Sequence, residues 1–417
     1  CAWGLEPPPG GKRRGEGIRV GHPDSGVLYH TDLFAEPDNA PTRVQTALQY
    51  DFVDRDRAAE NAEGQHGLST GSFIMSSERT GSITGIAPSA EIVPLRVTKP
   101  RFGIIPAPIL FDSGARALRD AIRYATFSAG CHVISISLGW FWNRSLHAAV
   151  REAEANNVIV CAAAGNYTQF VVWPAAYPET IAVGGCNALR LPWSGSAQGP
   201  LVAVSGPAED VWVASFTREG MEAPRTTSGT SFAVATVAGV AALWLAYHGR
   251  EALLARYGGL FTLSDVFRAV LQRSADPFAI ATGNRYGAGI VNARRALTTP
   301  LPTVDELRVQ ALQAAALPAP TTPTAAIAAL FPDISAGQLR SWLAGKLDVP
   351  ADEVDDRIAG FEEEIIFQIM TDPALRSELA GPVPSESGSA PMPQATPVAD
   401  APLPTGRLSS RLRARLE

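Results

Sequence analysis

The chain has 417 residues, of which 18% are charged and 46% hydrophobic, and its formal net charge is −6. This composition is typical of a soluble globular protein, and the length predicts one large domain with a smaller appendage. Because nucleic-acid-binding proteins need a basic surface, the acidic balance argues against a nucleic-acid partner.

Strand-like and helical patterns alternate between residues 18 and 300. β-branched runs that end in Gly or Asn predict strands, namely EIVPLRV (91–97), CHVISISLG (131–139), NVIVCAAAGN (157–166) and ETIAVGG (179–185). Apolar residues at helical spacing predict helices over 112–130 and 145–157. We therefore expect an α/β domain over 1–300, with a parallel central sheet and helices on both faces. In such sheets functional residues gather at the carboxyl ends of the strands.

The segment TTSGTSFAVATVAGVAALWLA (226–246) opens with small hydroxylated residues and continues as an apolar run. Its polar start and its glycines favour a buried core helix, so no transmembrane segment is predicted. Ser231, at the mouth of this helix, fits two roles. It could cap the helix, or it could be a nucleophile whose oxyanion lies near the free N–H groups of the first turn. Partner residues elsewhere in the chain must decide between them.

Beyond residue 300 the composition changes. Residues 301–330 predict an Ala/Pro-rich linker, 331–380 a small helical segment, and 381–417 a disordered tail with a basic end. Ser335 with Gln338 forms a capping-box pattern at the start of the helical segment. An apolar stripe at helical spacing consists of Val354, Ile358, Phe361, Ile365 and Ile369. This stripe leads us to expect a partner at the helices within 335–370.

The four cysteines are too few for a disulfide framework in a chain of this length. Cys131, Cys161 and Cys186 lie in apolar runs, as is typical of small core residues. The sequence begins at Cys1 without a signal peptide, which we interpret as a truncated or processed start in preference to a lipidated one. The cysteines and the start of the sequence therefore do not indicate where the protein is located.

Three further residues could supply the partners that a nucleophilic serine needs. Asp24 follows a short strand in PDSGV, His66 stands between glycines in GQHGLSTG, and Asn166 ends the run AAAGN. Each has an ordinary explanation when taken alone, as a turn former, a packed histidine or a helix cap. Their order with Ser231 is the observation that favours catalysis, because an acid, a base and a nucleophile then occur together.

These motifs make the chain similar to the subtilisin-like serine proteases, the subtilases. PDSGV resembles their D-[ST]-G motif, QHGLSTG resembles H-G-x-x-x-[AG], and SGTSFA resembles G-T-S-x-[AS], over residues 1 to about 300. The resemblance implies a serine endopeptidase that forms an acyl-enzyme on Ser231, with His66 as base and Asp24 as its orienting carboxylate. Asn166 and the Ser231 N–H would bind the oxyanion. The implied substrate is a polypeptide, no cofactor is required, and a secreted or cell-envelope location is favoured.

The resemblance also implies a substrate cleft with two walls. The walls are Ser137, Leu138 and Gly139 on one side, where the substrate main chain would pair, and Ala163, Ala164 and Gly165 on the other. Val172 and Trp173 predict an apolar, restricted pocket between them. Trp173-Pro174 matches a position where the family often has a cis proline, so a cis peptide is predicted there.

Some residues depart from the family pattern. His22 and Pro23 replace an apolar pair before Asp24, and Pro23 removes a backbone donor from a predicted central strand. Asp32 resembles a position that ligates calcium in some subtilases, but Arg79 stands in the companion loop where an oxygen ligand is needed. We therefore predict no metal site at Asp32, and leave structural calcium elsewhere open.

Two alternative functions follow from the same residues. Sedolisin-like peptidases share the SGTS motif, but they use Glu as base and Asp at the oxyanion site, where this chain has His66 and Asn166. A catalytically inactive subtilase scaffold that binds proteins would have lost a member of the triad, and this chain keeps all of them. The sequence therefore favours the active endopeptidase.

Overall fold

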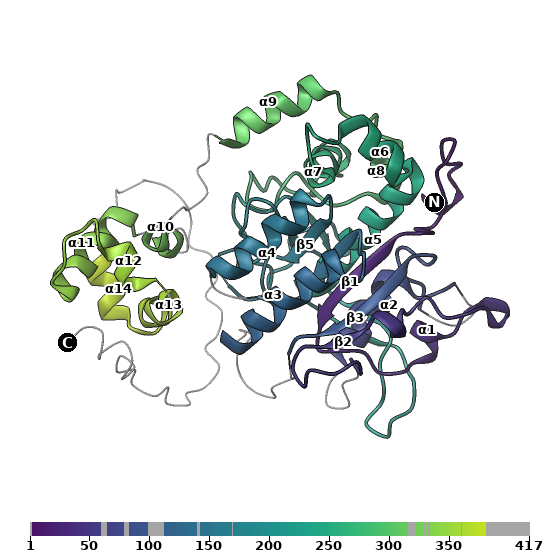
Figure 1. The fold of residues 1–417 in the computed structure, drawn as a ribbon, viewed down its shortest axis with the longest axis horizontal. Helices are drawn as coiled ribbons and strands as arrows, with labels where there is room; N and C mark the ends of the chain where they lie inside the picture. Colours follow the sequence, from purple (N-terminus) through teal and green to yellow (C-terminus); the bar gives the residue numbers. More distant parts are fainter. Residues whose placement is uncertain are drawn as a thin grey trace. The chain divides into compact units, whose positions relative to one another are not determined.

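The computed structural model describes residues 2–59, 65–78, 83–98, 112–139, 142–168, 170–315, 322–328, 331, 334–359 and 361–380. The chain divides into two compact units, Cys1–Leu317 and Pro318–Glu417 (Figure 1). The predicted disordered tail, 381–417, lies outside the described residues.

A seven-stranded parallel sheet forms the centre of the first unit, with strand order β2-β3-β1-β4-β5-β6-β7. The strands are β1 (Arg19–Asp24), β2 (Tyr50–Asp51), β3 (Glu91–Arg96), β4 (Val133–Ile136), β5 (Ile159–Ala163), β6 (Ile181–Cys186) and β7 (Val204–Pro207). Strands β4, β5 and β6 are buried along their whole length, because helices cover both faces. The predicted α/β fold is confirmed.

Two pairs of helices cover the sheet. On one face, α2 (His66–Met75) packs against α5 (Thr230–His248), and α5 spans strands β4 to β7. On the other face, α3 (Asp112–Phe127) packs against α4 (Arg144–Ala155), and the two cross the sheet side by side in Figure 1. A short antiparallel ribbon of β8 (Val211–Val213) and β9 (Arg225–Thr227) precedes α5. The remaining helices of this unit are α1 (Thr31–Phe34), α6 (Arg250–Tyr257), α7 (Leu263–Ser274), α8 (Ala293–Thr298) and α9 (Val304–Ala315).

Helix α5 is the central helix of the core. It is the one described helix that is long and apolar enough to cross a membrane, but 94% of its apolar window is buried inside the protein. Every residue from Thr230 to Ala246 is buried. The sequence therefore builds a core helix here, as its polar start and glycines predicted.

The first unit extends past the predicted boundary at residue 300. Leu307 of α9 is 2% exposed and belongs to the hydrophobic core, and α9 packs against α7. Tyr257 also donates a hydrogen bond to the Pro302 carbonyl, at 2.7 Å. Part of the stretch that was predicted as a linker is thus helical and attached to the sheet domain.

The second unit contains α10 (Pro323–Ala328), α11 (Ala336–Leu347), α12 (Val354–Ile358), α13 (Glu362–Thr371) and α14 (Pro373–Leu379). The predicted capping box is present, with Ser335 and Gln338 bonding each other's backbone N–H. The apolar stripe is divided between α12 and α13 instead of following one helix. Val354, Ile358 and Ile369 are at most 1% exposed, so the stripe is the unit's own core and not a free partner-binding face.

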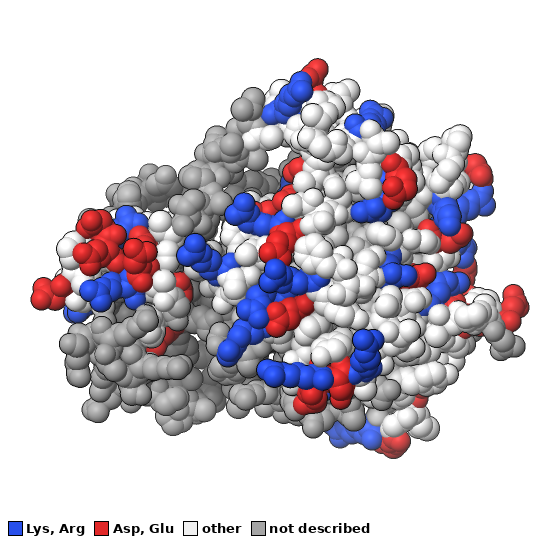
Figure 2. Space-filling view, in the orientation of Figure 1, with Lys and Arg blue, Asp and Glu red and all other residues white. Residues whose placement is uncertain are grey.

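Charges of both signs are interspersed on the face drawn in Figure 2. Several of them pair across elements, such as Arg123 with Glu152 at 2.9 Å and Arg19 with Glu91 at 2.9 Å.

Candidate active site

The carboxylate of Asp24 lies at the carboxyl end of β1 and is fully buried. Its Oδ1 accepts a hydrogen bond from the Ser25 backbone N–H at 2.6 Å. The chain turns at Gly26, whose φ of +89° is favourable only for glycine. The turn therefore fixes Asp24 with its carboxylate facing α2.

His66 is the first residue of α2, and two contacts hold this helix start against the Asp24 turn. The Gly67 N–H donates to Ser25 Oγ at 3.1 Å, and a Cβ on Gly67 would lie 2.1 Å from the Gly26 carbonyl oxygen. Only glycine permits this approach. Gln65 fastens the other side, since its Oε1 accepts from the Phe216 N–H at 2.7 Å.

Ser231 lies in the first turn of α5, and the three candidate side chains form one hydrogen-bonded series. His66 Nδ1 is 2.7 Å from Asp24 Oδ1, and His66 Nε2 is 3.1 Å from Ser231 Oγ. The His66 side chain is 39% exposed, whereas Asp24 and Ser231 are 0% and 6% exposed, so the imidazole is the member of the series that solvent reaches most easily. The structure thus brings together Asp24, His66 and Ser231, although 42 positions separate the first two and 165 separate the last two.

The electrostatics of the pair favour a charged carboxylate and a basic imidazole. Burial alone would raise the pKa of Asp24, but the charge and hydrogen bond of His66 outweigh it and hold that pKa at about 2. Burial lowers the pKa of His66, and Arg225 acts in the same direction, but the charge and hydrogen bond of Asp24 raise it overall. His66 is therefore suited to accept a proton from Ser231.

Asn166 follows β5 and faces the start of α5. Its Oδ1 accepts two hydrogen bonds from Thr230, from the backbone N–H at 2.9 Å and from Oγ1 at 2.7 Å. Because the amide oxygen is held in this way, the opposite end of the amide presents Nδ2 as a donor. The Ser231 N–H lies in the same first turn of α5, where helical N–H groups have no intrahelical acceptor. Two donors are thus available beside Ser231.

The residues predicted as cleft walls lie at the ends of β4 and β5. Ser137 Oγ donates to the Ser231 carbonyl at 3.2 Å, which ties the first wall to the serine. Ala163 and Ala164 are buried at 5% and 0% exposure, and Leu138 at 3%. Val172 lies against the last residue of the first predicted wall. A Cβ on Gly139 would lie 2.8 Å from Val172 Cγ2.

Two other predictions have different outcomes. The peptide bond Trp173-Pro174 is cis, as predicted. Asp32 lies in the first turn of α1, and its N–H donates to His30 Nδ1 at 3.0 Å. Arg79 lies outside the described residues. Over the ranges that the structure describes, there is no group of three or more His, Cys, Asp or Glu side chains that could hold a metal ion.

Sequence reasoning missed several side chains that hold the site together. Ser25 and Thr230 stand next to catalytic candidates in PDSG and SGTS, so their proximity was readable, but their hydrogen bonds were not. No motif indicated the roles of Gln65 and Thr70, and His22 stood out only as a departure from the family pattern, because each contact joins segments distant in sequence.

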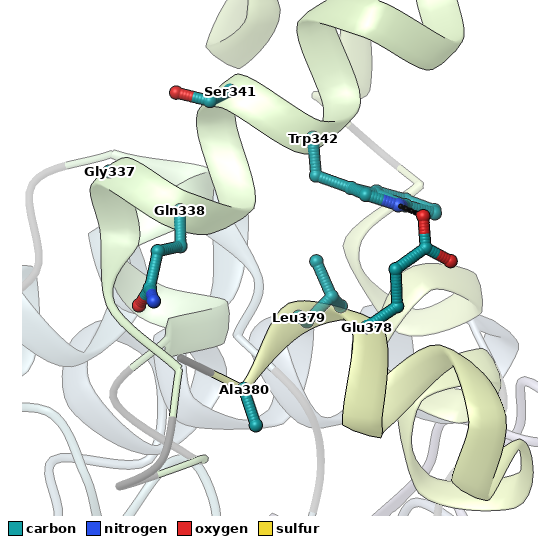
Figure 3. A pocket seen from close by; sticks show the side chains of 7 residues that line it. All are labelled: Gly337, Gln338, Ser341, Trp342, Glu378, Leu379 and Ala380. Carbon is teal, nitrogen blue, oxygen red and sulfur yellow. Dashed lines mark hydrogen bonds between the residues drawn. The ribbon is translucent and has the colours of Figure 1, made fainter. Parts of the chain in front are cut away.

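A shallow hollow in the second unit is separate from these residues (Figure 3). Its lining consists of Gly337, Gln338, Ser341, Trp342, Glu378, Leu379 and Ala380. Trp342 Nε1 donates to Glu378 Oε1 at 2.9 Å, which closes one side of the hollow. No catalytic candidate contributes to it.

A parallel α/β sheet that carries a buried carboxylate, an imidazole and a serine hydroxyl in hydrogen-bonded series defines a serine hydrolase. Residues 15–289 match the model of the Subtilase family, and the chain belongs to that family. It is 32% identical to thermitase of Thermoactinomyces vulgaris over 288 residues, which cover 68% of this chain and 89% of thermitase. The chain is accordingly a serine-type endopeptidase.

Further relatives agree with this assignment. Mycosin-1 of Mycobacterium tuberculosis is 29% identical over 335 residues, covering 69% of this chain and 70% of mycosin-1. The crystal structure of MycP1 from Mycobacterium smegmatis has a TM-score of 0.53 at 24% identity and covers 69% of this chain and 81% of MycP1. At this identity the structural likeness supports the fold.

Proposed function

We propose that Ser231, His66 and Asp24 are the catalytic triad of this endopeptidase. The observation that carries the proposal is the unbroken series of hydrogen bonds, 2.7 Å from Asp24 to His66 and 3.1 Å from His66 to Ser231. His66 Nε2 removes the hydroxyl proton while Ser231 Oγ attacks the peptide carbonyl carbon. Asp24 keeps the Nδ1–H tautomer of His66 and stabilises the imidazolium that forms.

The negative oxygen of the tetrahedral intermediate is bound by Asn166 Nδ2 and the Ser231 N–H. Each such donor is worth about 3–4 kcal/mol of transition-state stabilisation, because it is already oriented before the charge develops. His66 then gives its proton to the leaving amine, and an acyl group remains on Ser231. Water, deprotonated by His66, hydrolyses this ester. The nucleophile, base and donors all come from the chain, so the scheme needs no cofactor.

A fluorophosphonate probe tests the proposed nucleophile directly, since it labels only activated serines. We expect labelling of the wild-type chain and none of Ser231→Ala, with a matching loss of peptidase activity. Ser228→Ala is a matched control, because Ser228 lies three residues earlier and its hydroxyl accepts from the Asp210 N–H instead. Equal labelling of wild type and Ser231→Ala would overturn the assignment.

We further propose that the substrate residue before the scissile bond is small. The support is Val172, which is 7% exposed and contacts both walls of the cleft. A Cβ on Gly139 would lie 2.8 Å from Val172 Cγ2, and one on Gly165 would lie 3.2 Å from Val172 Cγ1. An isopropyl group between the two glycines leaves room for Ala or Ser in that pocket, and excludes Phe.

Two wider expectations stay predictions. A secreted or cell-envelope location draws support from the likeness to MycP1, described as coming from the ESX-1 type VII secretion system. Fractionation of cells that produce the chain tests it, and a purely cytosolic signal would contradict it. The prediction of a partner at 335–370 is supported only by the hollow beside Trp342, because the apolar stripe is buried within the unit. If a chain ending at Leu317 cleaves the same proteins with the same selectivity, that prediction is wrong.

A further inference from the structure

Two residues of β1 and two residues of α2 face each other across the interior. His22 and Asp24 are two positions apart on a strand, so their side chains point to the same face. His66 and Thr70 are four positions apart on a helix and also share a face. The His66–Asp24 pair is therefore accompanied by a second polar pair, His22 with Thr70, directly behind the carboxylate.

Contacts link this second pair to Asp24. His22 Nε2 is 2.9 Å from Thr70 Oγ1, and Thr70 Oγ1 is 3.2 Å from Asp24 Oδ2. His22 Nε2 itself is 3.7 Å from Asp24 Oδ2, too far for a direct hydrogen bond. His22 and Thr70 are 1% and 0% exposed. The hydrogen-bonded path from His22 to the carboxylate therefore runs through the Thr70 hydroxyl.

The surroundings of His22 place its proton. Burial lowers the pKa of His22, although Asp24 acts to raise it and His66 to lower it further, so the ring is neutral at neutral pH. His22 Nδ1 is buried and has no hydrogen-bond partner among the described residues. An orphaned buried N–H is costlier than an orphaned lone pair, so the proton resides on Nε2 and is donated to Thr70.

The Thr70 hydroxyl then has one proton to donate and three acceptors in range. These are Asp24 Oδ2 at 3.2 Å, the His66 carbonyl at 3.0 Å and the Gly67 carbonyl at 3.4 Å. The carboxylate is the only charged acceptor, and hydrogen bonds to ionised acceptors are about twice as strong. Asp24 is also fully buried, so an unbonded Oδ2 would carry a large desolvation penalty.

We propose that His22 and Thr70 are positioning residues of the catalytic site: His22 Nε2–H donates to Thr70 Oγ1, and Thr70 donates to Asp24 Oδ2. The proposal rests on the triad proposed above. The relay fixes the second oxygen of Asp24, as Ser25 N–H and His66 fix the first. It also disperses part of the carboxylate charge, so that Asp24 holds the His66 imidazolium less tightly.

The relay makes a prediction that a purely structural role would not. Without the Thr70 hydroxyl, Asp24 becomes a stronger partner for the charged form of His66, and the pKa of His66 rises. The charged groups that act on His66 are Asp24 and Arg225, and the Thr70 substitution replaces neither of them. The acid limb of the rate profile, where His66 is protonated, must therefore move to higher pH.

The test measures the second-order rate of Ser231 labelling by a fluorophosphonate, and kcat/KM on a peptide, from pH 4 to 10 in the full chain. For Thr70→Val we expect about a tenfold fall at the optimum and a rise of about half a pH unit in the acid midpoint. Thr70→Ser, which keeps the hydroxyl, restores both. His22→Leu shifts the midpoint in the same direction by less, and His22→Gln, which keeps a donor, restores it.

A double variant separates the relay from two independent effects. In His22→Leu with Thr70→Val, the midpoint should equal that of Thr70→Val alone, because the neutral His22 ring is hydrogen-bonded to Asp24 only through Thr70. Ser69→Ala is the matched control, since it removes another buried hydroxyl of α2, one that donates to the Ala214 carbonyl at 3.1 Å. Its midpoint should equal the wild-type value. A folded fraction that is constant over the pH range scales the rates without moving the midpoint, and thermal unfolding at each pH checks that it is constant.

Each outcome decides the matter. An unchanged midpoint in Thr70→Val means that the hydroxyl donates to the helix backbone, and it overturns the relay while leaving the triad intact. Additive shifts in the double variant overturn it as well. Failure of the wild-type chain to label removes the triad, and the relay with it.

Discussion

The substitution Asn166→Asp separates the donor function of Asn166 from its structural function. A carboxylate oxygen can accept the two hydrogen bonds from Thr230, at 2.9 Å and 2.7 Å, as the amide oxygen does. The other oxygen replaces Nδ2, so a hydrogen-bond donor becomes an acceptor at the position where the oxyanion develops. The fold of the site is kept while its electrostatics are reversed.

The expected loss follows from the missing donor. Removal of one oxyanion donor costs about 2.7–4 kcal/mol, which corresponds to a 10²- to 10³-fold lower kcat. The carboxylate adds repulsion of the oxyanion, so we expect a loss of at least about 10³. KM should change little, because the uncharged carbonyl of bound substrate interacts weakly with either side chain. Stability should also change little, because both bonds from Thr230 remain.

The assay is steady-state cleavage of a chromogenic peptide, with active enzyme counted by fluorophosphonate labelling and folding checked by thermal unfolding. Thr230→Val is the matched control, since it removes one of the two bonds that hold the amide but leaves Nδ2 in place. We expect at most about a tenfold loss in kcat from it. A kcat for Asn166→Asp within tenfold of wild type would refute the role of Nδ2.

Two further predictions concern the pocket and the pH dependence of stability. Val172→Gly should raise kcat/KM for substrates with Phe before the scissile bond by about tenfold or more, relative to substrates with Ala there. The reason is that space for even one methylene in a pocket is worth about 10-fold or more in kcat/KM. An unchanged preference when the two peptides compete for cleavage would show that Val172 does not limit the pocket. Burial, with the charges of Asp265 and Glu179, raises the pKa of Glu154 from 4.5 to about 7. The native state therefore binds more protons in this window, and stability falls as the pH rises through it. Glu154→Gln should gain about 1 kcal/mol in denaturant unfolding at pH 8 and none at pH 4, and a gain of equal size at both pH values would contradict this reasoning.

The elements with long periodic signals were predictable, and the short ones were not. Strands β4, β5 and β6 are β-branched runs buried on both faces, so composition alone indicates them. Strand β2 has two residues and carries no periodicity. Strand β7 reads VSGP, with residues that argue against a strand, and it forms because it lies at the edge of the sheet, where Pro is tolerated.

The C-terminal stripe shows where periodicity fails. Val354 and Ile358 belong to one helix and Ile365 and Ile369 to another, and the chain leaves the helical conformation at Ala359 between them, with φ −57° and ψ 118°. The spacing of apolar residues indicates which residues are buried, but it does not indicate a change of chain direction between two short helices. The burial of the stripe was therefore predictable. The sequence did not indicate that other residues of the same small unit cover it.

The candidate site divides in the same way. Asp24, His66, Asn166 and Ser231 could be named because their motifs occur as local strings. The residues that hold them are set by tertiary contacts, as with Gln65, which reaches a segment about 150 positions away. No local pattern encodes such a contact.

Pro23 stands in a strand that has neighbours on both sides, and the pairing explains how it is tolerated. The Arg19 carbonyl accepts from the His132 N–H, so the backbone of odd-numbered positions on β1 faces β4. Pro23 therefore directs its missing donor toward β4. Pairing between β1 and β4 ends at Gly21, however, while pairing with β3 continues to Asp24. The absent N–H thus falls where no ladder exists.

The same geometry connects the two residues that depart from the family pattern. The backbone N–H position of residue 23 points toward β4, beyond the end of the β1–β4 pairing. The side chains of His22 and Asp24, one residue to either side, both face α2. An apolar residue at position 22 would pack there without offering a hydrogen bond to Thr70. Because Pro fixes its own φ, it also restricts the backbone between the two polar side chains. The unusual HPD sequence is therefore one local arrangement, in which the strand keeps its β3 pairing and places a histidine behind the catalytic carboxylate.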